Sequence, residues 1–292
     1  MNVDTDSDRA GQLIGGRYEI VGLIEKGGQG SVYRARDLVG WREVAIKVLN
    51  DTVAHLPEWQ ERMRREAHAL GRLANTAAVR VLEEQRTDDG APCLVMELLE
   101  GLDLEHYLHM GESTGGRLPL EYLFTLLDPI IATLEVAHEL GITHRDVKPA
   151  NIFVVDGTRG GGMRLLDFGF VKVHSLQPVT EFGFVAGSPS YIAPEAWAGD
   201  PQKLDPRIDI YSSAAVVFRA LAGRPPFVAE DVREMLELAT TAERPSLFAL
   251  RPDLPPEIDD WVHQSLAIEP DDRFFKIRAM WNALKQTLRM EG

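Results

Sequence analysis

Two short apolar runs in the middle of the chain each adjoin polar residues that could bind metal and phosphate. The first run follows a loop that carries Asp146, Lys148 and Asn151, and the second is followed directly by Asp167. Two strands joined by the glycine-rich turn between these runs would bring the loop and Asp167 close together. Carboxylate and amide oxygens suit a hard divalent cation, and a lysine suits a phosphate. The pattern therefore indicates a site for metal-bound phosphate.

The order of these residues resembles the catalytic and metal-binding loops of eukaryotic-type (Hanks-type) protein kinases. The sequence His-Arg-Asp-x-Lys-x-x-Asn ends at Asn151, and Asp-Phe-Gly begins at Asp167. The resemblance implies that Asp146 accepts the proton of a substrate hydroxyl group and that Lys148 stabilises the moving phosphoryl group. It also implies ATP as the phosphate donor, with Mg²⁺ or Mn²⁺ held by Asn151 and Asp167.

A lysine and a glutamate outside these loops extend the resemblance. The apolar segment 44–49 carries one cation, Lys47, and a buried lysine needs a partner. Apolar residues recur at helical spacing over 57–73, and Glu66 lies on or beside the face that they form. The resemblance implies that Glu66 pairs with Lys47, which then holds the α- and β-phosphates. Taken alone, the helix would favour a surface salt bridge for Glu66.

The glycine-rich residues 25–30 join two predicted strands, 18–24 and 31–36. They resemble the loop that kinases close over nucleotide phosphates, because glycine lets backbone N–H groups approach a phosphate without an intervening side chain. Glu25 takes the place of the first glycine, where its carboxylate is expected to weaken ATP binding. Taken alone, the segment would fit an ordinary hairpin turn equally well.

The remaining nucleotide contacts follow from the resemblance. Met96 corresponds to the gatekeeper at the back of the adenine pocket, and the backbone of Glu97 and Leu99 corresponds to the hinge that holds adenine. Asp103 corresponds to the residue that reaches the ribose hydroxyl groups. The predicted nucleotide-binding residues are Ile24, Gly27, Gly28, Gly30, Val32, Ala45, Lys47, Met96, Glu97, Leu99, Asp103 and Phe153.

Composition limits the classes of protein that fit. The net charge of −14 disfavours a nucleic-acid partner or an anionic membrane surface. The single cysteine, Cys93, excludes an internal disulfide and fits a reducing compartment. No apolar run approaches the roughly 18 residues of a membrane span, and the N-terminus is too acidic and polar for a signal peptide. These features predict a soluble, cytoplasmic protein.

The strand and helix patterns predict an α+β protein, and the resemblance implies the bilobal kinase fold. Five antiparallel strands and one main helix would form the N-terminal lobe, and the C-terminal lobe would be mostly α-helical. The 45% hydrophobic residues suffice for a core in each lobe. The predicted organisation is a flexible leader at 1–16, a kinase domain at 17–288 with an N-lobe (17–96), a hinge (97–102) and a C-lobe (103–288), and a tail at 289–292.

Two predicted helices of the C-lobe are apolar on most faces and should be buried. One spans 122–140, and the other begins at Asp209, which could cap it. The resemblance implies that Asp209 also holds the backbone near Arg145. It further implies that Arg273 is the buried partner of Glu195, in the Ala-Pro-Glu triplet that closes the kinase activation segment.

Four apolar or aromatic residues are expected to stack into the column that links the lobes of active kinases. The resemblance assigns this role to Leu70, Leu82, His144 and Phe168.

The polar run 170–191 lacks regular periodicity and resembles the activation segment. The resemblance implies that the cation Arg145 binds an anion on this segment, and a phosphate on Thr180 would be such an anion. The neighbouring Glu181 could partly satisfy Arg145 without phosphorylation. We therefore expect basal activity that autophosphorylation of Thr180 raises.

The substrate class follows from two motifs. Lys148, two residues after Asp146, and the Gly-Ser-Pro turn at Ser188 resemble the serine/threonine class. The hydroxyl group of Ser188 is expected to bond Asp146 and Lys148 and so shape the surface that receives the substrate. Protein substrates are implied, together with self-association that would permit autophosphorylation.

Two other classes of function share parts of this pattern. A pseudokinase scaffold would keep the fold and lose the chemistry, and Glu25 is the feature that points that way. The intact set of catalytic residues opposes that interpretation. A small-molecule phosphotransferase of the same general fold would lack the activation segment.

Overall fold

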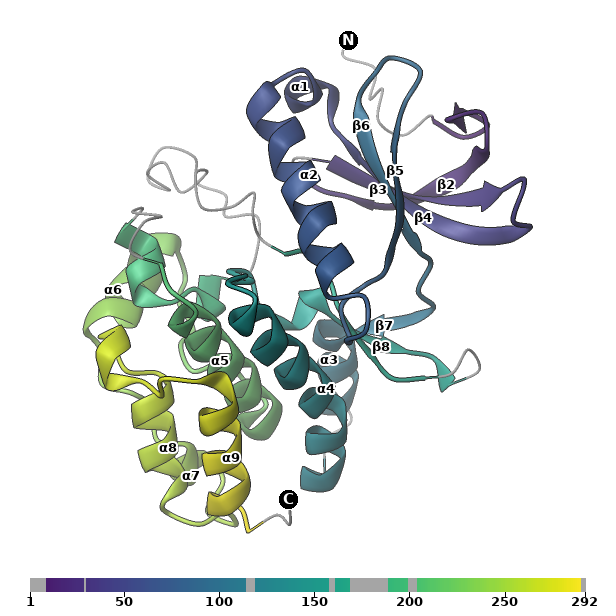
Figure 1. The fold of residues 1–292 in the computed structure, drawn as a ribbon. Helices are drawn as coiled ribbons and strands as arrows, with labels where there is room; N and C mark the ends of the chain where they lie inside the picture. Colours follow the sequence, from purple (N-terminus) through teal and green to yellow (C-terminus); the bar gives the residue numbers. More distant parts are fainter. Residues whose placement is uncertain are drawn as a thin grey trace. The chain divides into compact units, whose positions relative to one another are not determined.

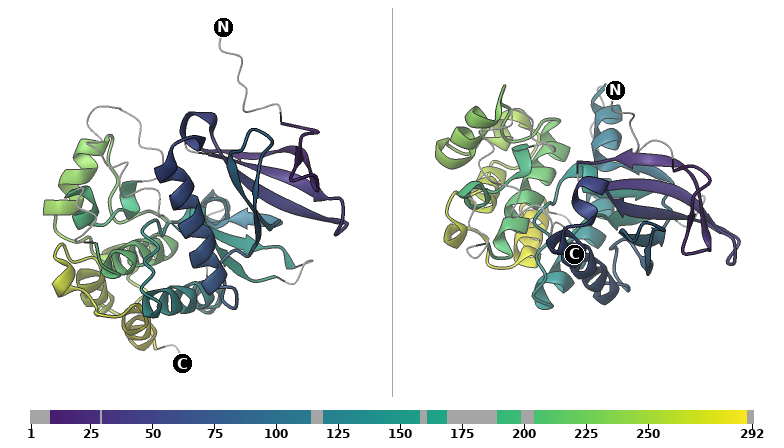
Figure 2. Two further views of the ribbon diagram at one scale, coloured as in Figure 1. Left: turned by 45° about the horizontal axis from the view of Figure 1, so that its top comes forward. Right: turned by 90° about the horizontal axis from the view of Figure 1, so that it is seen from above.

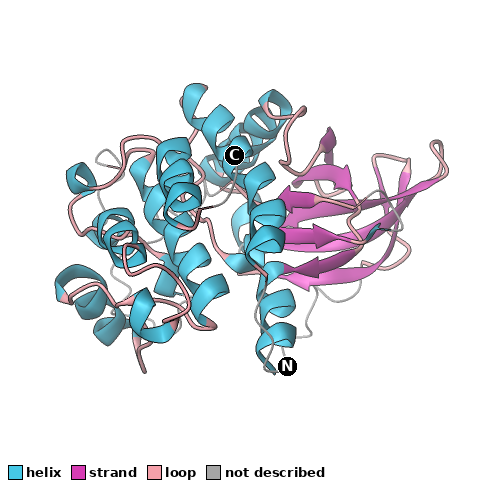
Figure 3. Cartoon of the chain, turned by 90° about the horizontal axis from the view of Figure 1, so that it is seen from below, coloured by secondary structure: helices cyan, strands magenta, loops and turns pink. Residues whose placement is uncertain are grey.

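The computed structural model describes residues 9–28, 30–113, 119–157, 161–168, 189–198 and 204–289. The chain forms two compact units, residues 1–100 and 101–292, and their boundary lies within the predicted hinge at 97–102. Strands dominate the first unit and helices the second, which confirms the predicted α+β class (Figure 3). The predicted regulatory residues Thr180 and Ser188 lie outside the described residues.

The first unit is built on an antiparallel sheet (Figure 1). Among the described residues this sheet has six strands, in the order β1-β2-β3-β4-β6-β5. Alternating β-branched and aromatic residues favour these strands, since every second side chain faces the same side of the sheet. The elements are β1 (Leu13–Ile14), β2 (Tyr18–Lys26), β3 (Gly30–Asp37), β4 (Arg42–Leu49), α1 (Asp51–Ala54), α2 (Pro57–Arg72), β5 (Val81–Arg86) and β6 (Pro92–Glu97).

The edge strand β1 differs from the expectation of five strands and of a flexible leader through residue 16. Ile14 is fully buried in the core of this unit. The backbone N–H of Gly11 bonds the carbonyl of Ile20, whose own N–H bonds the carbonyl of Gln12. Burial of an isoleucine, together with backbone pairing, offsets the entropy cost of ordering a short segment. The polar composition of the whole leader hides this local signal.

The sheet buries an apolar core on one face. Tyr33, Ile46 and Val95 lie side by side there, because the register pairs β3 with β4 and β4 with β6 at these positions. The helix α2 packs against β5 and β6 (Figure 2). It begins with Pro57 in its first turn, as predicted, and it buries an apolar face that includes Met63.

The second unit is mainly helical, with a small three-stranded sheet in the order β7-β8-β9. The antiparallel pair β8 and β9 confirms the predicted hairpin. The short β7 was not predicted, since three residues carry no clear alternation. The elements are β7 (Gly101–Asp103), α3 (Leu104–Ser113), α4 (Leu120–Glu139), η2 (Pro149–Asn151), β8 (Ile152–Val155), β9 (Met163–Leu165), η5 (Pro189–Tyr191), η6 (Pro194–Ala198), α5 (Arg207–Ala222), α6 (Val232–Thr241), α7 (Leu247–Leu250), α8 (Ile258–Ser265), η8 (Pro270–Asp272) and α9 (Ile277–Thr287).

The helix α5 is the centre of this unit. Every residue from Ile208 to Leu221 is buried, and α5 packs against α7, α8 and α9. The helix ends at Gly223, whose φ of 76° is a left-handed conformation that glycine adopts without strain. The predicted capping by Asp209 is wrong, because the helix begins after Pro206 and Asp209 lies inside the first turn.

The helix α4 is the long apolar helix that the sequence predicts, and it runs through Pro129 without interruption. The hydroxyl group of Thr133 donates a 2.8 Å hydrogen bond to the carbonyl of Pro129. Among the helices of the described residues, none is both long and apolar enough to cross a bilayer.

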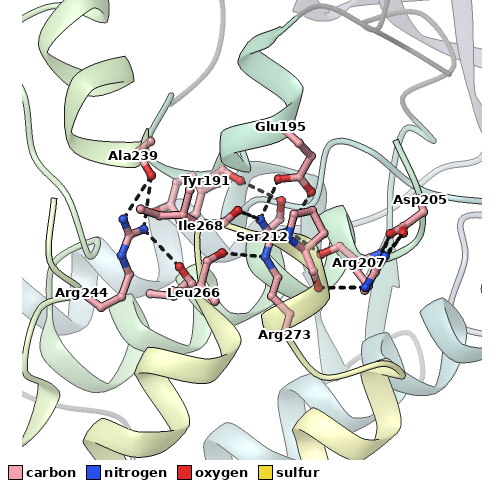
Figure 4. Close-up of polar contacts among 12 residues, drawn as sticks. Tyr191, Glu195, Asp205, Arg207, Ser212, Ala239, Arg244, Leu266, Ile268 and Arg273 are labelled. Atoms are coloured by element: carbon pink, nitrogen blue, oxygen red, sulfur yellow. Dashed lines mark hydrogen bonds and ion pairs between the residues drawn. The ribbon is translucent and has the colours of Figure 1, made fainter. Parts of the chain in front are cut away.

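The predicted pair of Arg273 and Glu195 is confirmed, and Figure 4 shows its surroundings. Two nitrogens of the Arg273 guanidinium donate 2.7 Å hydrogen bonds to the two carboxylate oxygens of Glu195. The same guanidinium donates to the carbonyls of Arg207, Ala267 and Ile268. This single buried side chain therefore joins η6, the start of α5 and the segment after α8.

We expect Arg273→Met to lower the free energy of unfolding of this chain by about 3–5 kcal/mol, because a largely buried carboxylate and three carbonyls lose their donor. Urea denaturation followed by circular dichroism measures the change. The matched control is Arg224→Met, at an exposed arginine, which should shift stability by less than about 0.5 kcal/mol. Equal effects of the two substitutions would contradict the role of Arg273.

Candidate active site

The predicted pairing of Lys47 with Glu66 is confirmed in the first unit. The Nζ of Lys47 lies 2.8 Å from Oε1 of Glu66. The Glu66 side chain is only 2% exposed, so the alternative of a surface salt bridge at the helix rim is wrong. The Lys47 side chain is 19% exposed, and it reaches from β4 to α2. A buried carboxylate of this kind requires a cation, and the lysine supplies it.

The strand register groups several predicted nucleotide-binding residues on one face of the sheet. Val32 is the β3 partner of Lys47, and Met96 is the β6 partner of Ala45. Because side chains two residues apart share a face, Ala45 and Lys47 point the same way. This face is opposite to the one that buries the apolar core around Ile46.

The glycines of the predicted phosphate loop differ in how much room the structure leaves for a side chain. A side chain at Gly30 would place its Cβ 2.6 Å from the carbonyl oxygen of Val48, so packing against β4 already requires glycine there. The N–H of Gly27 bonds the carbonyl of Gly30 and closes the turn. A Cβ at Gly28 would meet nothing within 4 Å. Glu25 is exposed in β2, and Ile24 lies in the irregular step of register next to it.

The predicted hinge residues lie at the end of β6. The N–H of Glu97 donates to the carbonyl of Arg80 at 3.0 Å, and the Glu97 carboxylate accepts from the N–H of Arg80 at 2.9 Å. The N–H of Glu97 is therefore already used, which directs any adenine contact of this residue to its carbonyl. Leu99 is half-buried two residues further along the chain.

In the second unit, Asn151 holds Asp146 by two hydrogen bonds. The Nδ2 of Asn151 donates to the backbone carbonyl of Asp146 at 2.8 Å and to its Oδ2 at 2.7 Å. The Nζ of Lys148 lies 3.2 Å from the same Oδ2. The carboxylate of Asp146 is thus oriented by a buried amide and a lysine from its own loop. The sequence spacing places all three residues within one turn that ends in η2.

The predicted contact of His144 with Phe168 is confirmed. Their ring centroids lie 4.6 Å apart, and both side chains are buried. The Nε2 of His144 bonds the carbonyl of Leu166 at 2.8 Å, and its Nδ1 accepts from the N–H of Asp146 at 3.2 Å. These bonds require the tautomer protonated at Nε2. Burial lowers the pKa of His144, which favours this neutral form.

The other two predicted members of the column, Leu70 and Leu82, lie in the first unit. Leu70 is buried in α2, and Leu82 packs against the apolar core of that unit.

The predicted role of Asp209 in holding the loop backbone is confirmed. Its Oδ2 accepts the N–H of His144 and its Oδ1 the N–H of Arg145, both at 2.8 Å. Arg145 has a φ of 66°, a left-handed conformation that costs a non-glycine residue free energy. Asp209 therefore holds the loop in a conformation that the chain would not adopt by itself.

His138 is a member of this site that sequence reasoning missed. Its Nε2 lies 2.8 Å from Oδ2 of Asp209. Burial would raise the pKa of Asp209, but the bonds from His138 and the backbone outweigh it and hold the pKa below its usual value. No motif pointed to His138, since one histidine in the last turn of an apolar helix fits a core position equally well.

A backbone hydrogen bond links the segments that carry the two predicted metal ligands, Asn151 and Asp167. The N–H of Leu166, the residue before Asp167, donates to the carbonyl of Asn151 at 2.8 Å. The nitrogen of the Asn151 amide makes both bonds to Asp146, so its oxygen is the atom suited to a cation. Asp167, with a φ of 45°, adds a carboxylate. These oxygen donors fit a hard cation. The described residues contain no cluster of three or more His, Cys, Asp or Glu that could hold a metal alone.

Asp103 and Phe153 are register partners in the small sheet. The carboxylate of Asp103 accepts the backbone N–H of His106 at 2.8 Å and lies 2.8 Å from Nδ1 of the same residue. The Asp103 carboxylate is thus hydrogen-bonded to the first turn of α3, and a bound ribose would have to share it.

Arg145 has a side chain suited to an anion. Its Nε is buried and has no hydrogen-bond partner in the described part of the chain. Burial lowers the pKa of its guanidinium, and the charge of Asp209 opposes that effect. The proposed anion sources, Thr180 and Glu181, lie outside the described residues.

Comparisons with known proteins agree with this geometry. A family model described as a protein kinase domain matches residues 18–283. The chain is 34% identical over 268 residues to serine/threonine-protein kinase PknL of Mycobacterium tuberculosis, covering 92% of this chain and 65% of PknL. It is 36% identical over 272 residues to serine/threonine-protein kinase PknA of the same species, covering 92% of this chain and 60% of PknA.

The solved structures include a similar domain. The kinase domain of PknI from Mycobacterium tuberculosis matches with a TM-score of 0.73 and 28% identity, over 95% of this chain and 98% of that one. The chain therefore spans nearly the whole of a solved domain, but less than two thirds of the length of PknL and PknA.

We expect Asp209→Asn to lower the free energy of unfolding by about 2–4 kcal/mol, because the amide cannot accept both backbone N–H groups. Hydrogen exchange at the amides of His144 and Arg145 should accelerate with it. The pKa of Asp209 is lowered on folding, so its contribution is present above the unfolded pKa of about 4 and is lost as the pH falls below it, through the lower folded pKa.

The stability difference between the wild type and Asp209→Asn should therefore shrink below that pH. Urea denaturation across a pH series measures it, and Asp260→Asn, at an exposed aspartate, is the matched control. A difference that stays constant into acid would contradict an ionised Asp209.

Proposed function

Because this chain belongs to the protein kinase domain family, we propose that it is a serine/threonine protein kinase, which transfers the γ-phosphoryl group of ATP to hydroxyl groups of proteins. The relatives PknL and PknA carry the name serine/threonine-protein kinase. The observation that carries the proposal is the orientation of Asp146 by Asn151 and Lys148. A carboxylate held at a defined place is what a base for a substrate hydroxyl requires.

In this mechanism Asp146 accepts the proton of the attacking hydroxyl group. The Asn151 amide and the Lys148 ammonium lie beside its Oδ2 and keep the carboxylate aimed. Lys148 also faces the negative charge of the phosphoryl group as it moves. Most of the acceleration then comes from positioning and electrostatic stabilisation by groups that are in place before the reaction.

Lys47 holds the α- and β-phosphates, and Glu66 orients it from α2. Val32, Ala45 and Met96, on the same face of the sheet, form the apolar surface against which adenine packs. When bound, Mg²⁺ or Mn²⁺ neutralises the phosphate charge, and Asn151 and Asp167 are its protein ligands. Asp103 is placed for the ribose if it exchanges one of its bonds to His106.

No observation on the described residues favours the pseudokinase alternative. Lys47 is paired with Glu66, and Asp146 is oriented by its neighbours. Glu25 is exposed, and its effect is expected on ATP affinity rather than on transfer.

The partners of the whole protein follow from the same proposal. They are protein substrates and, for autophosphorylation, a second copy of the chain. The net charge of −14 speaks against a nucleic-acid partner. A cytoplasmic location is proposed from the single cysteine, Cys93, which is buried and can form no disulfide within the chain.

We expect Lys47→Met to lower phosphoryl transfer by on the order of a hundredfold or more, because the phosphates lose the cation that positions them. The assay is incorporation of label from ATP with Mg²⁺, alone and with a generic protein substrate, and Asp146→Asn is the inactive reference. Near-normal turnover of Lys47→Met would overturn the site assignment.

This test needs a control for protein stability. Glu66 is 2% exposed, so Lys47→Met also deprives a buried carboxylate of its cation and should destabilise the protein. The double variant Lys47→Met with Glu66→Gln should recover much of the stability and remain inactive. Recovery of activity with stability would show that Lys47 acts only through folding.

We further expect autophosphorylation of Thr180 to raise activity, because a phosphate would give the Arg145 guanidinium, whose Nε is buried and has no partner among the described residues, a charge-assisted partner. Thr180→Ala should be well below the wild type but above Asp146→Asn. Glu181→Ala should lower the basal rate before phosphorylation. Mass spectrometry of active enzyme checks the modification, and an unmodified Thr180 together with a fully active Thr180→Ala would contradict this proposal.

A further inference from the structure

A buried arginine in α5 joins three elements of the second unit. Arg219 is 8% exposed, and its Nη1 lies 2.6 Å from both carboxylate oxygens of Glu105 in α3. The same nitrogen donates a 2.9 Å hydrogen bond to the hydroxyl oxygen of Tyr191 in η5. The Nε donates a longer bond, 3.5 Å, to Glu112 at the other end of α3. A cation within the buried length of α5 thus has two carboxylates and one hydroxyl group around it.

Tyr191 is held at both of its ends. Its hydroxyl group accepts from Arg219. Its backbone carbonyl accepts from the hydroxyl group of Ser212 at 2.8 Å (Figure 4). The ring between these bonds is 3% exposed. Burial raises the pKa of Tyr191 to about 12, so the phenol stays protonated. The carbonyl of Pro189 accepts the N–H of Ile192, which closes the short turn around Tyr191.

The same network reaches the catalytic loop. The helix α3, which carries Glu105 and Glu112, packs against η2. The last residue of η2 is Asn151, whose amide orients Asp146. Arg219 therefore connects the turn at 189–192 to the helix on which the catalytic loop rests.

We infer that Arg219 is a positioning residue for the protein substrate, acting through the hydroxyl group of Tyr191 to fix the turn at 189–192 relative to Asp146. The inference rests on the proposed function, because a substrate hydroxyl group must meet Asp146 while its peptide lies on a neighbouring surface. A turn anchored to the helix beneath the catalytic loop provides such a surface at a constant position. Arg219 touches neither nucleotide nor the reacting atoms in this arrangement.

The charges explain why arginine suits this position. Glu105 and Glu112 are partly exposed, with side-chain exposures of 35% and 27%, and water solvates part of their charge. Arg219 has its own charge compensated by these carboxylates and still has N–H groups for the Tyr191 hydroxyl. A lysine would keep the charge, but it presents a point charge without the planar fork that reaches several acceptors at once.

The test compares steady-state kinetics of the full chain with a generic protein substrate such as casein and with ATP. Tyr191→Phe removes one hydroxyl group and keeps the ring. It should raise the KM for the protein by about tenfold, the effect of one hydrogen bond to a charged group, with kcat and the KM for ATP nearly unchanged. Arg219→Met should raise the KM at least as much, and Arg219→Lys should lie between it and the wild type.

The double variant separates positioning from independent effects. If Arg219 acts through Tyr191, Arg219→Met with Tyr191→Phe should have the same KM for the protein as Arg219→Met alone. The matched control is Arg251→Met. Arg251 is 6% exposed and donates to the carbonyl of Leu221, but it has no bond to Tyr191. It should lose stability without a change in the KM for the protein.

A second measurement does not depend on transfer. Hydrogen exchange of the Ile192 amide should accelerate in Tyr191→Phe and Arg219→Met and stay at the wild-type rate in Arg251→Met. An unchanged KM and unchanged exchange in Arg219→Met would overturn the inference while wild-type transfer upheld the proposed function. If the wild type transfers no phosphoryl group, the proposed function fails, and the exchange rates alone decide whether Arg219 positions the turn.

Discussion

The buried carboxylate of Asp209 is the constraint on which the candidate site depends. It accepts the backbone N–H groups of His144 and Arg145, and His138 lies within hydrogen-bond distance of it. Arg145 has a left-handed backbone conformation that is unfavourable by itself. Without an acceptor at that place, two buried N–H groups would have no partner and the loop would relax. Because Asp209 lies in the first turn of the most deeply buried helix, the core of the unit fixes the geometry of its catalytic loop.

A second principle recurs at three sites, each a largely buried cation paired with a carboxylate. Lys47 in β4 pairs with Glu66, Arg273 after η8 pairs with Glu195, and Arg219 in α5 pairs with Glu105. A buried pair of this kind adds little net stability compared with apolar packing, since desolvation offsets the attraction. It does fix which elements meet and in what orientation. These pairs specify positions, which is what a site acting by positioning and electrostatics requires.

In the predicted phosphate loop, the packing of the strands restricts one glycine and leaves another unrestricted. Gly30 has no room for a side chain because β4 passes too close, whereas Gly28 has open space around it. Strand packing therefore accounts for the glycine at Gly30 and does not account for the one at Gly28. Glu25, in the place of the first glycine of the motif, is compatible with the strand, where it is exposed.

The sequence by itself determined the fold class, the hairpin that carries Asp167, the pairing of Lys47 with Glu66 and the pair of Arg273 with Glu195. Local periodicity predicted the fold class and the hairpin, and a charge in an apolar segment pointed to Lys47. The family resemblance assigned Glu66 as its partner and supplied the pair of Arg273 with Glu195. The strand β1 and the short β7 could be identified only in the tertiary structure, because two or three residues carry no periodic signal. The same holds for two contacts, that of His138 with Asp209 and that of Arg219 with Tyr191. The partners lie 71 and 28 residues apart in the chain, respectively. Such contacts are set by how helices pack around a shared core, and sequence spacing contains no record of that packing.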